Sequence, residues 1–441
     1  MRILFIYVDI RKEEGCIGKT MQGSYKDLGG MFYMGLAHIS AVLKAKGHET
    51  KLVFITDMDG ALPKIHETIE NWNPNMVAYS ATVTMFPYVS EISKEIRNEY
   101  PNMPQVIGGA HATVSPEEVL NNSAIDYLVV GEGEYPLLEL CEGKDKKAIK
   151  NLAYLEGGTL KSNPLRRLID LDTLPFPDWG LFDYLNCYDG NLKRLNVVVS
   201  RGCPYKCAYC NNHAIASIYK GLGRYDRFPS PAKAIGILKS GLEQYPELEY
   251  VDFRDDDLLL HQKWFEEFSL KYYDEVGLPS VCIARVDQIN ERNAVLLKEY
   301  MKCKMIRVGV ESGNEYIRKL CKRNMSNEKI IKAFKILQKY NIKTYAYYMI
   351  GLPYETPEMF RDTIKLHAQL GVDVYHLSVF YPFKRTQLYD ICEMEGWITD
   401  KKIPDYFHET ILDQPSISND EIKYFIDNFD ALAEKEGGSK E

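Results

Sequence analysis

Apolar runs and amphipathic stretches alternate along the first 140 residues of the chain. The runs have the length and composition of buried strands, and in the stretches between them apolar residues recur every three or four positions, as in helices that cover a core. The predicted strands are Ile3–Val8, Lys51–Phe54, Val77–Ser80, Gln105–Ile107 and Tyr127–Val130. Strands that alternate with helices in this way predict a doubly wound α/β domain around a parallel sheet.

A second series of the same kind begins near residue 192. Each of its apolar runs except the last is followed by a helical pattern, so this half of the chain also predicts a parallel α/β domain. The predicted strands are Leu195–Ser200, Tyr250–Phe253, Val281–Ala284, Met305–Val310, Thr344–Ile350 and Val374–Tyr381. In a barrel built from such strands, the functional side chains are expected at the carboxyl ends.

The two series are separated by a segment without clear periodicity. It contains Gly157-Gly158 and the sequence Leu174-Pro-Phe-Pro-Asp178, whose paired prolines stiffen the chain. After the second series, an amphipathic stretch near Ile422–Leu432 predicts a terminal helix. The expected parts are a doubly wound domain over 1–141, a linker over 142–191, the second α/β domain over 192–395 and a helical tail over 396–441.

The composition is that of an ordinary globular protein, and its charge argues against some functions. A net charge of −8 does not suit a protein that mainly holds nucleic acid. No apolar run approaches the roughly 18 residues of a membrane span. The apolar start of the chain, which soon reaches Asp9 and Arg11, is too short for the core of a signal peptide. We therefore expect a cytoplasmic protein whose ten cysteines are thiols or metal ligands.

Three of these cysteines, Cys203, Cys207 and Cys210, lie within eight residues directly after the first strand of the second series. Thiolates so close together can bind one soft metal centre, but they leave a tetrahedral site one ligand short. His213 could complete a zinc site, although a Cys-x3-Cys-x2-Cys-x2-His grouping would be unusual. An iron–sulfur cluster with one open iron is favoured, because it accounts for the missing ligand.

The cysteine spacing, with Tyr209 just before the last cysteine, resembles that of the radical S-adenosylmethionine (SAM) enzymes. Gly108-Gly-Ala-His-Ala-Thr113 followed by Asp126-Tyr-Leu-Val-Val-Gly-Glu-Gly-Glu134 resembles the cobalamin-binding domain of the B12-dependent members. The resemblance implies a Rossmann-like cobalamin domain followed by a partial (β/α)6 barrel of the TIM type. The implied cofactors are a [4Fe–4S] cluster on the three cysteines, SAM chelated to its open iron, and cobalamin. No Asp-x-His-x-x-Gly motif occurs, so the histidine that this motif gives to cobalt in other cobalamin proteins has no counterpart.

The same resemblance implies that SAM binds at the carboxyl ends of the barrel strands. Tyr209 would pack near adenine or, alternatively, under the cluster. Glu311 and Ser312, in a Glu-Ser-Gly sequence, would hold the ribose hydroxyls. Gly351 begins a Gly-Leu-Pro turn that would close over the adenine.

Charged residues at two further strand ends would hold the amino-acid part of SAM. Arg285 would face the carboxylate of SAM, for which a guanidinium fork is well shaped. Asp255 or Asp256, in a Phe-x-Asp-Asp sequence, would contact the amino group of SAM. The alternative is that these adjacent carboxylates simply form a solvated loop.

Polar and glycine residues at the carboxyl ends of the first series of strands are the candidates for cobalamin, because doubly wound sheets bind ligands at that edge. Glycines there would let the backbone approach a ligand closely. His111 either touches the ligand or is a loop residue bonded to its neighbours, and His38 is predicted to be structural. The candidates are Ser80, Thr82, Gly108, Gly109, His111, Gly131, Glu132, Gly133 and Glu134.

The resemblance therefore predicts a cobalamin-dependent radical SAM enzyme that cleaves SAM reductively to a 5′-deoxyadenosyl radical. It favours methylation of an unactivated carbon, as in the class B type methyltransferases, over a non-methylating rearrangement, cyclisation or oxidation. The alternative from another class is a non-catalytic cobalamin- or zinc-binding module. The implied partners are a small-molecule or peptide substrate and an external one-electron reductant of the flavodoxin or ferredoxin type, and no nucleic acid is expected.

Overall fold

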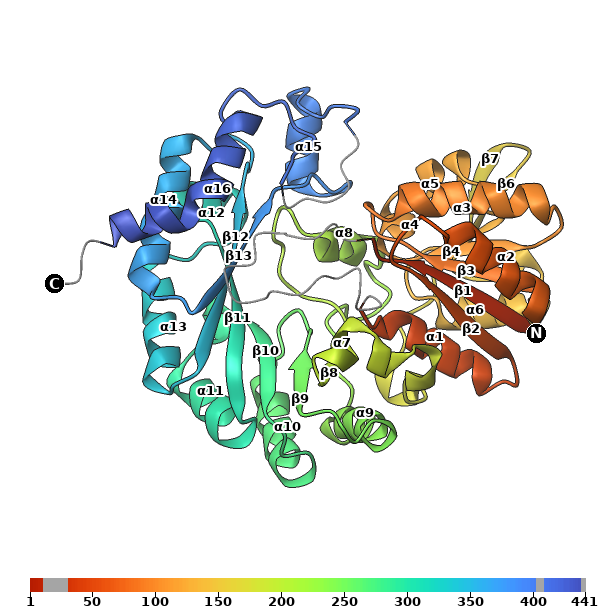
Figure 1. Ribbon diagram of the computed structural model, residues 1–441, viewed down its shortest axis with the longest axis horizontal. Coiled ribbons are helices and arrows are strands. Elements are labelled where there is room, and N and C mark those ends of the chain that lie inside the picture. Colours follow the sequence, from red (N-terminus) through yellow and green to blue (C-terminus); the bar gives the residue numbers. More distant parts are fainter. Residues whose placement is uncertain (11–30, 402–407, 438–441) are drawn as a thin grey trace.

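Two sheets, seen on either side of Figure 1, organise the computed structural model, which describes residues 1–10, 31–401 and 408–437. Sheet A has the strand order β2-β1-β3-β4-β5-β6-β7. Its strands are β1 (Arg2–Val8), β2 (Glu49–Ile55), β3 (Met76–Ser80), β4 (Gln105–Gly108), β5 (Tyr127–Val129), β6 (Leu152–Glu156) and β7 (Thr159–Ser162). The first five are parallel, with β1 between β2 and β3, so the predicted doubly wound fold is confirmed.

Helices cover both faces of sheet A. The odd-numbered residues of β1 from Ile3 to Tyr7 pack on one face, and the even-numbered residues from Leu4 to Val8 pack on the other, as the alternation of a strand requires. The first face is covered by α1 (Met34–Lys44) and α6 (Glu134–Cys141). The second face is covered by α2 (Ala61–Trp72), α3 (Phe86–Glu99), α4 (Ala110–Val114) and α5 (Pro116–Asn122).

The segment expected to be a linker, residues 142–191, differs from that expectation. Its first part forms an antiparallel hairpin, in which β6 pairs with β5 and β7 pairs with β6. Gly157 and Gly158, with φ of 59° and 76°, make the turn between the two strands, a conformation that favours glycine. The hairpin is short and β7 is mostly exposed, so it leaves little hydrophobic pattern in the sequence. The rest of the segment consists of α7 (Tyr188–Asn191) and short 3₁₀ turns at Lys146–Ala148, Leu171–Thr173, Trp179–Leu181 and Tyr184–Asn186.

Sheet B is a half-barrel of six parallel strands in the order β13-β12-β11-β10-β9-β8. The strands are β8 (Arg194–Val197), β9 (Tyr250–Phe253), β10 (Ser280–Arg285), β11 (Cys303–Glu311), β12 (Lys343–Ile350) and β13 (Val374–Val379). The helices of this domain are α8 (Asn211–Ile218), α9 (Pro231–Gln244), α10 (Gln262–Glu275), α11 (Glu291–Val295), α12 (Glu315–Leu320), α13 (Asn327–Lys339), α14 (Pro357–Leu370) and α15 (Gln387–Met394). A π-helical turn at Leu296–Tyr300 continues α11. Each strand pairs only with its neighbours in sequence, and the sheet curls as Figure 1 shows, so the predicted partial (β/α)6 barrel is confirmed.

The predicted tail helix is α16 (Asn419–Glu436), and it packs into the core of the half-barrel. Phe425 lies 5.0 Å from Phe360 of α14, measured between ring centroids. Phe429 packs on Tyr348, whose side chain points from β12 to the outside of the barrel. Ser418 and Glu421 form a capping box that fixes the start of the helix. The tail is therefore part of the outer helical layer.

In the ranges that the structure describes, no helix combines the length and the apolar character needed to cross a membrane. Helix α8, which follows the cysteine loop, lies between the two domains in Figure 1 and contacts α4 of the first domain. The segment that follows β8 therefore leads directly to a contact with the first domain.

Candidate functional site

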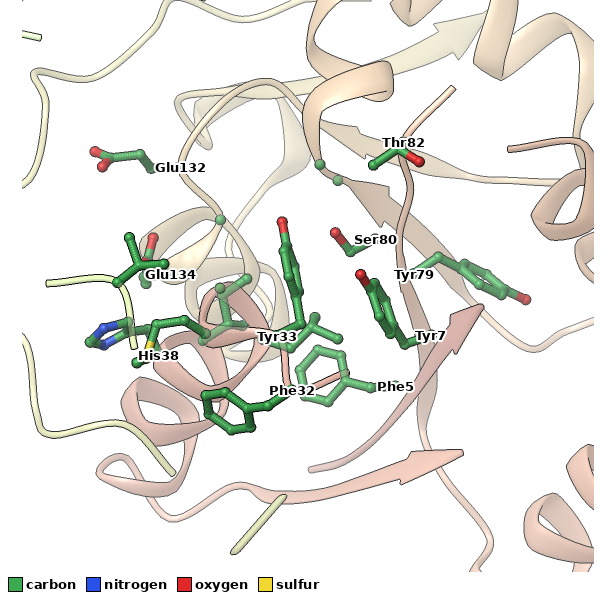
Figure 2. A pocket seen from close by; sticks show the side chains of 18 of the residues that line it. Phe5, Tyr7, Phe32, Tyr33, His38, Tyr79, Ser80, Thr82, Glu132 and Glu134 are labelled. Atoms are coloured by element: carbon green, nitrogen blue, oxygen red, sulfur yellow. The ribbon is translucent and has the colours of Figure 1, made fainter. Parts of the chain in front are cut away.

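A cavity of about 710 Å³ separates the carboxyl edge of sheet A from the half-barrel. Figure 2 shows its wall on the side of sheet A, where Tyr33 and Tyr7 stack with ring centroids 5.0 Å apart. The opposite wall comes from the barrel and includes Asn196, Ser200 and Arg254. The cavity therefore borders the carboxyl ends of strands from both domains, where ligands of such folds bind.

Eight of the nine residues predicted for cobalamin line this cavity, and His111 does not. The ring of His111 packs on Phe86, and its Nε2 lies 3.8 Å from Oε1 of Glu118. Burial lowers its pKa, which favours the neutral imidazole. His111 instead lines a smaller cavity of about 310 Å³ together with Tyr381 and Lys384. The eight that line the main cavity are Ser80, Thr82, Gly108, Gly109, Gly131, Glu132, Gly133 and Glu134.

Two of these glycines are needed by the chain itself. Gly109 has φ of +97°, and a Cβ there would lie 2.8 Å from the backbone N and O of Ala81. Gly131 has φ of +82°, and a Cβ there would lie 1.8 Å from the hydroxyl of Tyr219. Tyr219 follows α8, so Gly131 admits a side chain of the second domain. The close approach that these glycines permit is therefore to protein atoms.

Glu132 and Glu134 are held by arginines that follow β8. Glu132 accepts hydrogen bonds from Arg201 at 2.8 Å and from Arg227 at 2.7 Å, and Glu134 accepts one from Arg201. Arg201 stands two residues before Cys203. Burial alone would lower the pKa of Arg201, but Glu134 and Glu132 raise it overall. These ion pairs fix the cysteine loop against the first domain.

His38, predicted to be structural, lines the cavity and was not recognised as a candidate. Its Nδ1 is buried and has no hydrogen-bond partner among the described residues. Burial, aided by the positive charges of Arg201 and Lys233, lowers its pKa to about 3, so the imidazole is neutral at neutral pH. A lone histidine within a helix carries no signal that distinguishes it from a core residue.

The other two cysteines of the loop lie close enough to Cys203 to affect its pKa. Burial raises the pKa of Cys203 to about 12 and that of Cys210 to about 11, and Asp256 adds to both effects. Such thiols deprotonate at neutral pH only when a cation binds them. Nη1 of Arg285 lies 3.4 Å from the sulfur of Cys207, which places a positive charge beside the group. The donors therefore suit a positively charged metal centre.

The arrangement of the thiols also bears on the kind of centre. Within the described residues, no group of three His, Cys, Asp or Glu side chains could hold a single metal ion. A [4Fe–4S] cluster makes no such demand, because each cysteine binds a different iron atom. The donor set at Cys203, Cys207 and Cys210 thus fits the cluster.

Tyr209 and Glu311, both predicted for SAM, lie together beside the cysteines. The hydroxyl of Tyr209 donates a hydrogen bond of 2.9 Å to Oε1 of Glu311. Arg323 lies 3.4 Å from the same oxygen and 3.9 Å from the sulfur of Cys207. Glu311 has φ of +68°, a conformation that costs a non-glycine residue energy and is common at functional sites. Arg323 was missed because it belongs to no motif, and only the fold brings it here.

The adjacent aspartates play different parts. Asp255 is fully buried and accepts hydrogen bonds from the backbone N of Val199 at 3.3 Å and of Ser200 at 2.6 Å, so its carboxylate anchors the start of the cysteine loop. Its burial raises its pKa to about 6. The side chain of Asp256 is exposed to water, and it lies close to Cys203. It accepts a hydrogen bond from Asn212, and partial desolvation by the surrounding protein raises its pKa. Of the two candidates for the amino group of SAM, Asp256 is the one whose carboxylate is open.

The remaining predicted SAM residues are fixed by the chain. Arg285 stacks over the ring of Tyr205 at 3.6 Å and pairs with Asp287 at 3.0 Å. Ser312 is fully buried, and its hydroxyl accepts a hydrogen bond from the backbone N of Asn314 at 3.2 Å.

The turn at Gly351 is held by a buried carboxylate. Its φ is +79°, and its N–H donates to Oε2 of Glu355 at 2.8 Å. Burial raises the pKa of Glu355 to about 8. This glutamate, which no motif singled out, fixes the Gly-Leu-Pro turn at the end of β12.

Two family models match the chain in the order that the fold shows. The model for the B12 binding domain matches residues 29–141, and the model for the radical SAM superfamily matches residues 197–367. The chain therefore combines a B12 binding domain with a radical SAM domain. Its cofactors are a [4Fe–4S] cluster, SAM and cobalamin, as predicted. The alternative of a non-catalytic module is not supported.

Several known proteins are similar over most of the chain. An uncharacterized methyltransferase of Pyrococcus horikoshii is 27% identical over 365 residues, which are 81% of this chain and 77% of the relative. The anaerobic magnesium-protoporphyrin IX monomethyl ester cyclase of Cereibacter sphaeroides is 26% identical over 409 residues, 88% of this chain and 63% of the relative. The structure of the radical SAM methyltransferase TsrM of Kitasatospora setae has a TM-score of 0.70 at 17% identity and covers 91% of this chain and 77% of TsrM. At that identity, TsrM supports the fold alone.

Proposed function

We propose that this enzyme methylates an unactivated carbon of a substrate bound in the half-barrel, with cobalamin bound at the edge of sheet A. The observation that carries the proposal is the single cavity that borders Ser80 and Gly109 on one side and Ser200 and Arg254 on the other. A cobalamin and a substrate in that space would face each other without a protein wall between them. The methyltransferase name of the Pyrococcus relative supports the same outcome.

In this proposal, Cys203, Cys207 and Cys210 hold the cluster, and the guanidiniums of Arg285 and Arg323 stand beside Cys207. When bound, the cluster supplies the electron that cleaves SAM, and cobalamin supplies the methyl group. The protein side chains bind and orient the reactants and exclude water. The two arginines would place positive charge beside the cluster on the side of Cys207.

Glu311 would orient the ribose of SAM. Its Oε1 already accepts from Tyr209 and pairs with Arg323, which leaves Oε2 for the ribose hydroxyls. Asp256 would bind the SAM amino group and Arg285 its carboxylate, while Tyr209 and the turn at Gly351 would enclose the adenine. These five contacts would bring SAM to the open iron in one orientation.

Ser80, Thr82 and the glycine-bearing strand ends of sheet A would contact cobalamin, with the backbone at Gly108 and Gly133 open to the cavity. Glu132 and Glu134 would act indirectly, by fixing Arg201 and the cysteine loop. A radical SAM enzyme also needs a reductant. We propose a flavodoxin or ferredoxin as that donor and the cytoplasm as the compartment, because reduced cluster ligands require a reducing environment.

The proposal is tested on protein purified and reconstituted without oxygen. With SAM, hydroxocobalamin and a reductant, the enzyme should contain iron, sulfide and cobalt and should form 5′-deoxyadenosine and S-adenosylhomocysteine. Replacing Cys203, Cys207 and Cys210 by alanine should abolish the cluster absorption and the formation of 5′-deoxyadenosine. Cys303→Ala, at a buried cysteine at the start of β11, is the control and should leave both intact.

Two results would contradict the proposal. Full retention of iron in the triple variant would remove the cluster assignment. The second result is a folded enzyme that forms 5′-deoxyadenosine without binding hydroxocobalamin at saturating concentration. That result would exclude methyl transfer from cobalamin and would indicate a radical enzyme that uses SAM alone.

A further inference from the structure

We infer that the substrate carries an anionic group, a carboxylate or a phosphate, and that Arg254 binds this group inside the half-barrel. The inference rests on the proposed function, since it concerns the substrate of the same cavity. None of the contacts proposed above with the cluster, SAM or cobalamin involves Arg254. It is the x of the Phe-x-Asp-Asp sequence.

The alternation of β9 places Arg254 in the barrel lumen. Val251 and Phe253 pack in the core beneath the outer helices, with Phe253 5.8 Å from Phe268 of α10. Asp252 and Arg254 therefore point to the inner side. Arg254 lines the 710 Å³ cavity, and its side chain is 26% exposed, so a ligand in the cavity can reach it.

The lumen has more positive than negative charge around this residue. Asp252 is fully buried and is shared by three guanidiniums: Arg194 at 3.1 Å, Arg254 at 3.0 Å and Arg307 at 2.5 Å. Asp189 is the second carboxylate of the group and pairs with Arg194 at 2.7 Å. Three arginines against two aspartates leave one positive charge without a partner.

Of the three arginines, Arg254 is the one whose positive charge is least compensated. Arg307 makes two contacts with Asp252, and Arg194 contacts both aspartates, whereas Arg254 makes one contact through Nη2. Its Nε is buried and has no hydrogen-bond partner in the described parts of the chain. An oxyanion bound to the exposed part of the Arg254 guanidinium would supply the missing negative charge through charge-assisted hydrogen bonds.

The other carboxylates near the cavity are already engaged. Asp9, which lines the cavity, accepts a hydrogen bond from the backbone N of Met31 at 3.4 Å, Glu311 pairs with Arg323, and Glu132 and Glu134 pair with Arg201. Burial lowers the pKa of Arg254. The negative charge of Asp252 raises this pKa, and the positive charges of Arg307 and Arg194 lower it further. Since a guanidinium stays charged in a protein, the missing counter-charge is expected from the ligand.

Aromatic side chains from β12 share the lumen with Arg254. Tyr345 and Tyr347 lie with ring centroids 5.0 Å apart, and Tyr347 is close enough to Arg254 to affect its titration. An aromatic acid is therefore a suitable probe. We choose benzoate, its neutral analogue benzamide, and inorganic phosphate.

The experiment is calorimetric titration of the reconstituted holoenzyme with SAM and cobalamin bound. Benzoate should bind at least 10-fold more tightly than benzamide, and inorganic phosphate should displace benzoate. Arg254→Met should lower the affinity for benzoate at least 10-fold and leave the affinity for benzamide unchanged. Arg254→Lys should retain part of the preference for benzoate over benzamide. The control is Arg292→Met, at an arginine of α11 whose side chain is 66% exposed. It should leave the affinities for benzoate and benzamide unchanged.

Equal affinity for benzoate and benzamide in the unmodified enzyme would overturn the inference, and this comparison needs no variant to fold. Loss of SAM affinity in Arg254→Met would assign the residue to the SAM carboxylate, and loss of hydroxocobalamin affinity would assign it to the phosphate of cobalamin. Either result would also overturn it. These readouts are independent of SAM cleavage, so a failed inference and a failed function remain distinct.

Discussion

The carboxyl edge of sheet A and the carboxyl ends of sheet B border the same cavity but are built differently. At sheet A, the protein itself uses the charged and glycine residues: Glu132 and Glu134 pair with Arg201, and Gly109 and Gly131, both at positive φ, make room for Ala81 and Tyr219. At sheet B, Arg254 keeps a buried Nε that has no hydrogen-bond partner among the described residues, and the carboxylate of Asp256 is open to water. The first edge mainly positions the domains, and the second mainly offers reactive and charged groups to ligands.

The largest expected effect comes from breaking the contact between the two edges. Arg201→Met leaves Glu132 and Glu134 partly buried with one cation fewer, and should lower the free energy of unfolding by about 3 kcal/mol, the lower end for a broken buried pair. It should also weaken hydroxocobalamin binding, since the cysteine loop loses its hold on sheet A. Urea unfolding and absorbance titration measure the two effects.

The matched control is Arg166→Met, which breaks a pair with Glu139 inside the first domain. It should cost stability without changing cobalamin affinity. Adding Glu132→Gln and Glu134→Gln to Arg201→Met should restore part of the stability, because it removes the uncompensated charges. A fully stable Arg201→Met protein with normal cobalamin binding would show that the ion pairs do not join the domains.

A smaller effect is expected from the proposed SAM ligands at the carboxyl ends of sheet B. Glu311→Gln and Arg285→Met should each weaken SAM binding by about 1–3 kcal/mol, the scale of a lost charged hydrogen bond, while the cluster absorption stays unchanged. Glu315→Gln, on the exposed start of α12, is the control and should bind SAM normally. Unchanged SAM affinity in both test variants would place SAM elsewhere.

The smallest effect concerns the pH dependence of stability. Burial raises the pKa of Glu355 from 4.5 to about 8, so the folded state prefers the protonated form. The stability that this preference gives is fully present below the unfolded pKa and is lost as the pH rises through about 8. Glu355→Gln should flatten the fall in stability between pH 5 and 8 in urea unfolding series, and an unaltered pH profile would contradict this origin.

The sequence predicted both sheets because ten of the eleven predicted strands are apolar runs bounded by helical patterns, and Lys51–Phe54 is half-buried in the edge strand β2. The motifs also singled out Tyr209, Glu311 and the three cysteines one by one, and the fold brings them together. The β6–β7 hairpin was missed because β7 is exposed and carries no apolar alternation.

Other functional residues could not be found from the sequence for a physical reason. Arg201, Arg323 and Glu355 are single charges whose partners lie 3 to 116 positions away. Their roles arise only when the fold brings buried charges together. His111 was placed at the cobalamin edge because it follows two glycines, but the short helix α4 turns its ring toward Phe86.

The central claim is that both edges meet in one cavity, so that cluster and cobalamin lie near each other. Pulsed electron paramagnetic resonance of the holoenzyme in the cob(II)alamin form tests it directly, by comparing the spin relaxation of cobalt with the cluster oxidised and reduced. The account predicts faster relaxation when the cluster is reduced, and loss of this effect when Cys203, Cys207 and Cys210 are replaced by alanine. Identical relaxation in both cluster states of the loaded enzyme would contradict it.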